Sequence, residues 1–220
     1  MSTPAAPSRW GPAWARWVGR FMFRVLWSAE VVGKDRVPRT GPVVLAANHV
    51  HMLDGPMLIG MAPRPLHILV KKEMFQGVMG LVLRAAGQIE TDRSSGRSAL
   101  NQGLAVLRRG GAVGIFPEGE RGAGSVRSAR AGAAWLAVNG QAQVVPVAIL
   151  GTRRPDQGKN ALPPLRRRFV IEFGDPIDVT HDDVPRRQVV TEATETIRAA
   201  MATLVAQTSE RTGLTLGTEQ

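Results

Sequence analysis

The sequence predicts an α/β domain with a mainly parallel central sheet flanked by helices. Short apolar segments of about four to eight residues, bounded by turn residues, alternate along the chain with segments of helical periodicity. Most of these short segments are continuously apolar, which is typical of strands covered on both faces of a parallel sheet. We find no internal repeat and no second domain boundary, and a chain of 220 residues suits a single α/β domain.

The N-terminal segment, residues 1–28, is expected to consist of a disordered tip, residues 1–8, and an amphipathic helix over residues 9–27. At about 100° per residue, one face carries four arginines and another is apolar, with Trp10 and Trp17 at the border. The arginines are Arg9, Arg16, Arg20 and Arg24, and the apolar face holds Trp14, Val18, Phe21, Met22 and Val25. Phe23 and Trp27 break this pattern. The arrangement favours a helix lying in a membrane interface, and the alternative is a helix docked on the protein's own core.

The remaining chain divides into a predicted domain over residues 29–208 and a polar tail over residues 209–220. Apolar runs bounded by turn residues predict strands, and Gly or Pro at their ends marks the helix boundaries. The predicted strands cover residues 29–33, 43–47, 66–70, 88–93, 112–116, 144–150 and 169–173. The predicted helices cover residues 56–61 and 78–86, the segment ending at Arg108-Arg109-Gly110, the segment through Ala133 and Val138, and one starting near Asp183. That last helix places Val190, Ala193, Ile197, Met201 and Leu204 on its inner face.

Composition narrows the functional classes. The formal net charge is +10, almost wholly from arginine, which favours anionic partners: phosphate esters, acidic lipid surfaces or nucleic acid. The chain has no cysteine, so disulfides, thiolate metal sites and a cysteine nucleophile are excluded, and a reducing compartment is compatible. No uncharged apolar run of about 18 residues is present, so no membrane-spanning segment is expected.

The candidate catalytic residues are His49 and Asp54, in the segment that follows the strand predicted over residues 43–47. A strand-to-helix turn is where α/β proteins commonly contact their ligands. A carboxylate there can hold the imidazole in one tautomer and stabilise its protonated form, so that His49 acts as a general base on an alcohol. Two other interpretations stay open: Asp54 is a helix cap, or His49, His51 and Asp54 form a metal site.

Four charged clusters end predicted strands or begin helices, and a parallel sheet would gather them at one edge. They are His49/Asp54, Lys71/Lys72, Asp92/Arg93 and Glu118/Arg121. A base beside several cations suits a reaction on an alcohol that also carries a phosphate. The sequence contains no Gly-x-Ser-x-Gly motif, so the attacking group would be the substrate's own hydroxyl.

The motifs resemble those of the lysophosphatidic acid acyltransferases, the PlsC-type family of glycerolipid acyltransferases. The resemblance covers roughly residues 30–177 and comprises several blocks in the family's order. The blocks are Asn48-His49 with Asp54 (His-x4-Asp), the segment 88–93 ending in Asp-Arg, Phe116-Pro117-Glu118-Gly119-Glu120-Arg121, Arg130-Ala131-Gly132-Ala133, and Val144-Val145-Pro146-Val147. Two departures are His51, where a small hydroxyl residue is common, and Glu120, where Thr is common.

The resemblance implies transfer of an acyl chain from acyl-CoA or acyl-carrier protein to the free hydroxyl of 1-acylglycerol-3-phosphate or a related lysophospholipid, without a cofactor or a metal. His49 would be the base and Asp54 its orienting partner. Further substrate-binding residues would be Arg93, Arg121, Glu118, Gly119, Lys71 and Arg130. The arginines would hold the acceptor's phosphate, and backbone N–H groups near the His-Asp turn would stabilise the oxyanion.

The expected partners are therefore the donor thioester, the lysophospholipid acceptor and an anionic membrane surface, with no nucleic acid. The expected location is the cytoplasmic face of the cell membrane, as a peripheral protein. Two alternatives come from other functional classes: a basic membrane-binding module without catalysis, or a metallohydrolase that uses His49, His51 and Asp54.

Overall fold

A seven-stranded sheet forms the centre of the protein in a computed structural model that describes residues 7–92, 96–119, 124–153, 161–179 and 186–216. The strand order is β1-β7-β6-β2-β5-β3-β4. The strands are β1 (Ser28–Val32), β2 (Val43–Ala47), β3 (Leu66–Lys71), β4 (Ile89–Thr91), β5 (Ala112–Ile115), β6 (Gln143–Leu150) and β7 (Arg168–Phe173). All neighbouring pairs are parallel except β6 with β7, which confirms the predicted mainly parallel sheet.

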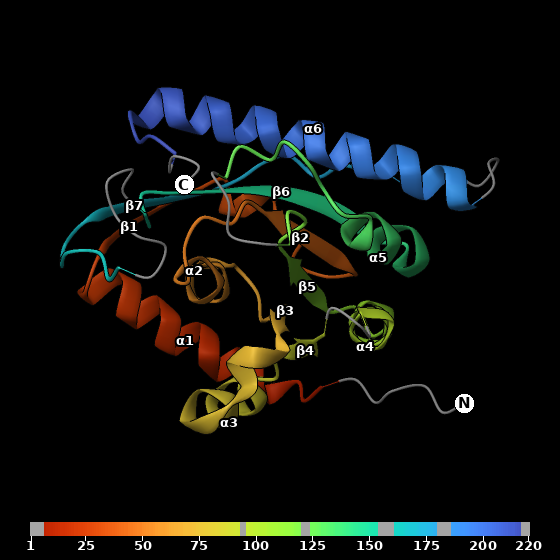
Figure 1. Cartoon of the computed structure of the whole chain (residues 1–220), viewed down its shortest axis with the longest axis horizontal. Helices are drawn as coiled ribbons and strands as arrows, with labels where there is room; N and C mark the ends of the chain where they lie inside the picture. The colour runs from red at the N-terminus through yellow and green to blue at the C-terminus, as the bar shows by residue number, and fades with distance from the viewer. Residues whose placement is uncertain (1–6, 93–95, 120–123, 154–160, 180–185, 217–220) are drawn as a thin grey trace.

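Helices cover both faces of the sheet, as the continuously apolar strands predict (Figure 1). The helices are α1 (Trp10–Val25), α2 (Asp54–Met61), α3 (Gly77–Ala85), α4 (Gly96–Arg108), α5 (Gly132–Gly140) and α6 (Arg186–Thr212), with short 3-10 turns η1 (Lys34–Arg36) and η2 (Lys72–Phe75). In β2, Val44 and Ala46 pack against α4, α5 and α6, whereas Val43, Leu45 and Ala47 pack against α1 and α2. Both faces of this strand are therefore buried in hydrophobic cores.

Helix α1 docks on the domain through one row of residues spaced four apart, Gly11, Ala15, Gly19 and Phe23. A Cβ atom added to Gly19 would lie 2.9 Å from the Cα of Gly60, so α1 and α2 cross almost backbone to backbone. Phe23 and Trp27, which break the amphipathic pattern, are buried against Phe169, on which Trp27 stacks while Phe23 is tilted. The helix therefore packs on the protein's own core along one face, as the alternative interpretation expected.

A second face of α1 remains exposed, and it carries large apolar side chains. Trp10 is 84% exposed, Trp17 61% and Phe21 70%, and Val18 and Val25 are exposed beside them. Of the predicted apolar face, Met22 instead packs against the core and Trp14 donates its indole N–H to the Ala85 carbonyl at the end of α3. Helix α3 lies beside α1 (Figure 1) and exposes Val78 and Leu81. No helix among the described residues is both long and apolar enough to span a bilayer.

Helix α6 covers the sheet with the predicted inner face. Ala193, Ile197, Met201 and Leu204 are buried, and Val190 packs partly against the same core. The helix continues to Thr212, four residues beyond the predicted end of the domain, and Leu214 also packs against this core. The predicted start of this helix at residues 183–185 lies outside the described residues.

Candidate active site

The His-Asp turn begins where β2 ends, in the middle of the sheet between β6 and β5. Asn48, the first residue after β2, is fully buried. Its side-chain oxygen accepts the N–H of Ile149 at 2.7 Å and its amide donates to the Ile149 carbonyl at 3.1 Å. Asn48 therefore continues the pairing of β2 with β6 and fixes the point at which the chain leaves the sheet.

His49 and Asp54 form the predicted pair. His49 Nδ1 lies 2.9 Å from Asp54 Oδ2, and the Asp54 side chain is completely buried whereas that of His49 is 21% exposed. A buried carboxylate that accepts the Nδ1–H bond leaves Nε2 with its lone pair, as a general base requires. The imidazole stacks on the Phe116 ring, with centroids 4.3 Å apart, which fixes the orientation of the base.

Asp54 organises the whole turn. Its Oδ2 also accepts the backbone N–H groups of Val50 and His51, each at 2.7 Å, and its Oδ1 accepts the hydroxyl of Thr152 at 2.7 Å. Sequence reasoning missed Thr152; the available signal was its position just after β6, the neighbour of β2 in the sheet. Four hydrogen bonds to one buried carboxylate hold the negative charge in a fixed position behind the imidazole.

The structure excludes one alternative for this turn and narrows the expected oxyanion donors. Asp54 does not cap α2, because no side-chain cap bond forms there and its oxygens accept the N–H groups of Val50 and His51 and the hydroxyl of Thr152 instead. The backbone N–H groups of His49, Val50 and His51 cannot serve as an oxyanion hole, because each already donates to a carboxylate. An oxyanion would need other donors.

His51 faces away from the pair. Its Nε2 lies 3.1 Å from the Ala161 carbonyl and its Nδ1 accepts the N–H of Leu53 at 3.3 Å, so the buried imidazole has hydrogen-bond partners at both nitrogens. Its ring nitrogens are therefore not directed at a metal position shared with His49. Among the described residues no cluster of three or more His, Asp or Glu side chains could hold a metal ion.

Glu118 joins the turn from the segment that follows β5. Its Oε1 accepts the backbone N–H of His49 at 3.0 Å. Burial raises the pKa of the Glu118 carboxyl, while the His49 N–H and imidazole oppose this rise. Gly119 adopts a positive φ of 73°, and a Cβ there would lie 2.6 Å from the Arg130 guanidinium. The structure thus brings Glu118, Gly119 and Arg130 together beside His49.

The other predicted cations lie further along the same edge. Lys71 ends β3, and Lys72 forms a 3.6 Å salt bridge with Asp92 after β4. Because β2, β5, β3 and β4 are parallel, these groups share the carboxyl edge of the sheet with His49, as predicted, but β5 separates β3 from β2. Arg93 and Arg121, the predicted phosphate ligands, lie outside the described residues.

This arrangement suits proton transfer to and from an alcohol. It provides a base oriented by a buried carboxylate, a second carboxylate that fixes the backbone, and an arginine nearby. Within the described residues, no serine or threonine hydroxyl is hydrogen-bonded to His49 as a nucleophile would be. The geometry therefore agrees with a nucleophile supplied by the substrate.

Comparison with known proteins identifies the family. Residues 28–150 match the family model described as Acyltransferase. The 1-acyl-sn-glycerol-3-phosphate acyltransferase of Bacillus subtilis is 30% identical over 174 residues, which cover 76% of this chain and 83% of that protein. The human 1-acyl-sn-glycerol-3-phosphate acyltransferase beta is 31% identical over 124 residues, which cover 54% of this chain and 45% of that protein.

A solved structure shares the fold. The 1-acyl-sn-glycerophosphate acyltransferase PlsC of Thermotoga maritima superposes with a TM-score of 0.68 at 19% identity, over 89% of this chain and 80% of that one. Fold, family model and the Bacillus relative agree with the motifs around His49, Glu118 and Arg130. The chain belongs to the lysophosphatidic acid acyltransferase (PlsC-type) family, and it is an acyltransferase of the 1-acylglycerol-3-phosphate O-acyltransferase type.

Proposed function

We propose that this protein transfers a fatty acyl group from acyl-CoA or acyl-carrier protein to the free hydroxyl of 1-acylglycerol-3-phosphate, making phosphatidic acid for phospholipid biosynthesis. The observation that carries the proposal is the 2.9 Å contact between His49 Nδ1 and the buried Asp54, which leaves Nε2 as the base. The names of the similar enzymes supply the acceptor. The matched family gives no support to a non-catalytic module or a metallohydrolase.

The proposed reaction needs no cofactor, because His49 supplies the base, the acceptor supplies the nucleophile and the donor thioester supplies the leaving group. His49 Nε2 takes the proton from the acceptor hydroxyl as its oxygen attacks the thioester carbonyl. The C–S bond then breaks, and the thiolate leaves with the proton that His49 returns. The products are an ester and a free thiol. Asp54 holds the imidazole and stabilises its charge while the proton resides on it.

The acceptor's phosphate would be held by Arg93 and Arg121, on the strength of their motifs, because a guanidinium can bind a phosphate through two parallel hydrogen bonds. Arg130 and Lys71 would add positive charge at the same edge of the sheet. Glu118 and Gly119 would shape the loop, since Glu118 bonds the backbone of His49 and Gly119 makes room for the Arg130 side chain.

The test of function is release of free thiol from palmitoyl-CoA, measured with and without a panel of lysolipids. Lysophosphatidate should stimulate release and yield phosphatidic acid in equal amount, whereas a neutral monoacylglycerol should be a much poorer acceptor. Thiol release that is independent of any acceptor would identify a thioesterase, and loss of turnover on adding a chelator would identify a metal enzyme.

The membrane contact proposed for this enzyme is the exposed apolar surface of α1, continued by α3, on the cytoplasmic face of the cell membrane. Both substrates carry acyl chains, and burying apolar side chains contributes about 25 cal/mol per Å². Trp17 supports an interfacial position, because its indole is 61% exposed and Arg16 and Arg20 lie over it at 5.3 and 5.5 Å.

A triple substitution on the outer face tests this contact. Deleting residues 1–27 would also remove the buried Phe23 and Trp27 and would disturb the core. A better test of the contact is the triple variant Trp17→Gln, Phe21→Gln and Val25→Gln. The variant should lose sedimentation with liposomes yet keep its turnover on detergent-dispersed substrate and its melting temperature. Undiminished sedimentation would place the membrane contact elsewhere.

A further inference from the structure

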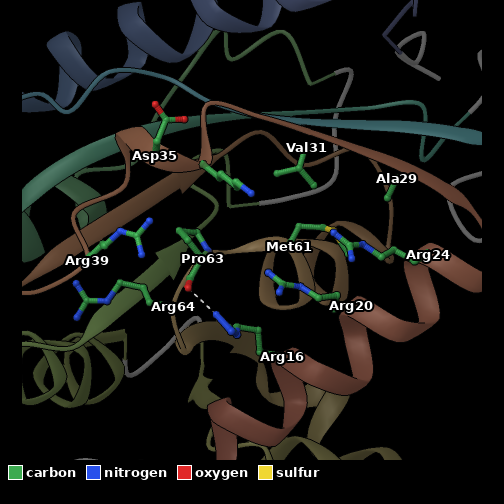
Figure 2. Close-up of a pocket in the computed structure, with 11 residues that line it drawn as sticks. Arg16, Arg20, Arg24, Ala29, Val31, Asp35, Arg39, Met61, Pro63 and Arg64 are labelled. Carbon is green, nitrogen blue, oxygen red and sulfur yellow. Dashed lines mark hydrogen bonds between the residues drawn. The ribbon is translucent and has the colours of Figure 1, made fainter.

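A second basic site lies outside the His-Asp turn. It is a cavity of about 560 Å³ between α1, β1, η1 and the end of α2. Six cationic side chains and one carboxylate line it: Arg16, Arg20, Arg24, Lys34, Arg39, Arg64 and Asp35. Figure 2 shows the arginines of α1 on one side of the pocket and Arg39 and Arg64 on the other.

Within the described residues, the lining of this pocket carries six cationic side chains and a single carboxylate, that of Asp35. Among the described residues none of the six cations forms a salt bridge. Arg64 is held by the carbonyls of Pro38, Gly41 and Gly110, and Arg16 donates to the Pro63 carbonyl. Within the same part of the chain, the buried Nε–H of Arg20 has no hydrogen-bond partner. A phosphate would supply both the missing charge and the missing acceptor.

The pocket is separate from the acyl-transfer site. The carbonyls that hold Arg64 precede β2 and β5, whereas His49 and Glu118 follow the same two strands. Five residues of β2 span about 16 Å. In a lysophosphatidate the phosphate and the reacting hydroxyl are only a few bonds apart. The phosphate of the acceptor at His49 therefore does not reach this pocket.

The faces of α1 indicate which kind of phosphate can reach this pocket. The helix carries three rows of residues spaced four apart: the docked row from Gly11 to Phe23, the row Arg16, Arg20 and Arg24, and the row Trp17, Phe21 and Val25. With about 100° between residues, the arginine row lies between the docked row and the exposed apolar row. When the apolar row enters the bilayer, the arginines lie at the level of the lipid head groups.

We propose that this pocket binds the phosphate head group of an anionic phospholipid of the bilayer, as a site distinct from that of the reacting lysolipid. The proposal rests on the membrane contact of α1 proposed above. The chains of the bound lipid would run along Trp17, Phe21 and Val25, while Arg20, Arg24 and Arg39 surround its phosphate. The enzyme would thereby prefer anionic membranes and be held on them with its carboxyl edge in a fixed orientation.

The test compares how the full chain sediments with two kinds of vesicle. One contains phosphatidylcholine alone, and the other contains equal parts of phosphatidylcholine and phosphatidylglycerol. The charge variant is Arg20→Gln with Arg39→Gln. The filling variant is Ala29→Trp, which keeps every cation but occupies the pocket that Ala29 lines. The matched control is Arg108→Gln with Arg187→Gln, two exposed arginines on α4 and α6, across the sheet from α1. None of these residues belongs to the proposed acyl-transfer site.

The charge variant should partition about 30-fold more weakly into phosphatidylglycerol vesicles, the equivalent of about 1 kcal/mol per cation. The filling variant should lose most of the preference for phosphatidylglycerol, and the matched control should change less than about threefold. All three should keep wild-type turnover in detergent.

Several results would contradict lipid binding in this pocket without contradicting the membrane contact of α1. One is a filling variant that still prefers phosphatidylglycerol, because surface charge alone would then explain binding. Another is displacement of wild-type protein by soluble CoA, or a raised KM for palmitoyl-CoA in the charge variant, because the pocket would then serve the donor's phosphates. If wild-type protein binds neither vesicle, the membrane contact itself is wrong. Acyl transfer in detergent does not depend on any of these outcomes.

Discussion

Replacing Asp54 by Asn separates the two roles of this carboxylate, in the structure of the turn and in the chemistry. The amide oxygen can accept the same three donors as Oδ2, from His49, Val50 and His51, and the amide N–H can donate to the hydroxyl of Thr152. The fold should therefore survive. A hydrogen bond to a charged acceptor contributes about 1 kcal/mol more than one to a neutral acceptor, so the four bonds of Asp54 predict a loss of stability of about 4 kcal/mol at most.

The effect of Asp54→Asn on turnover should be larger. The imidazolium that forms during the reaction loses its compensating charge, and we expect kcat to fall by about 10²–10⁴, or about 3–5 kcal/mol of transition-state stabilisation. The assay is the initial rate of thiol release from palmitoyl-CoA with lysophosphatidate, beside urea unfolding of the same protein. Thr152→Val is the matched control: it removes only the bond to Oδ1, so we expect a loss of about tenfold or less.

A folded Asp54→Asn variant that keeps turnover within about threefold of the wild type would refute this reasoning. Asp54 would then be only the acceptor that shapes the turn, and the base at His49 would need no charged partner.

Other substitutions test separate parts of the account. Arg93→Lys or Arg121→Lys should raise KM for lysophosphatidate at least about tenfold with little change for palmitoyl-CoA, because lysine cannot make the two-pronged contact; an equal effect on both substrates contradicts this. Burial lowers the pKa of His67, so stability should decrease as the pH falls below 6.5, by up to about 1.4 kcal/mol per unit, and His67→Asn should reduce that slope in urea titrations. Gly60→Ala should lower the melting temperature, since its Cβ would lie 2.6 Å from the backbone of Gly19; an unchanged melting temperature would show that α1 is loosely docked.

The sequence was sufficient for most of the fold because local patterns determine it. The apolar runs that become β2, β5 and β6 are strands buried in the hydrophobic cores, and the 3.6-residue period of α6 identifies the residues that it buries. The antiparallel direction of β7 could not be predicted, because the β6–β7 connection follows no periodic pattern. Helix α1 was ambiguous for a physical reason: one face of small residues docks on α2 while the next remains apolar and exposed.

The site was predictable as far as its chemistry follows from residue type and spacing. His49 and Asp54 are five residues apart, so their contact follows from a short turn. Thr152 reaches Asp54 from 98 residues away through the pairing of β6 with β2, which local sequence does not specify. The oxyanion donors could not be assigned for a related reason: the carboxylates of Glu118 and Asp54 accept the N–H groups of His49, Val50 and His51, and Glu118 comes from a distant segment.

The most direct test of the central claim, that His49 is the base, is the turnover of His49→Ala beside His51→Ala, each corrected for the folded fraction. His49 is partly exposed and its side chain bonds Asp54, whereas His51 is buried and bonds Ala161 and Leu53. We therefore expect His49→Ala to melt near the wild type and lose about 10²–10⁴ in kcat. His51→Ala should melt lower yet keep most of its turnover per folded molecule. The reverse pattern, with full turnover in His49→Ala and none in folded His51→Ala, would contradict the assignment of the base.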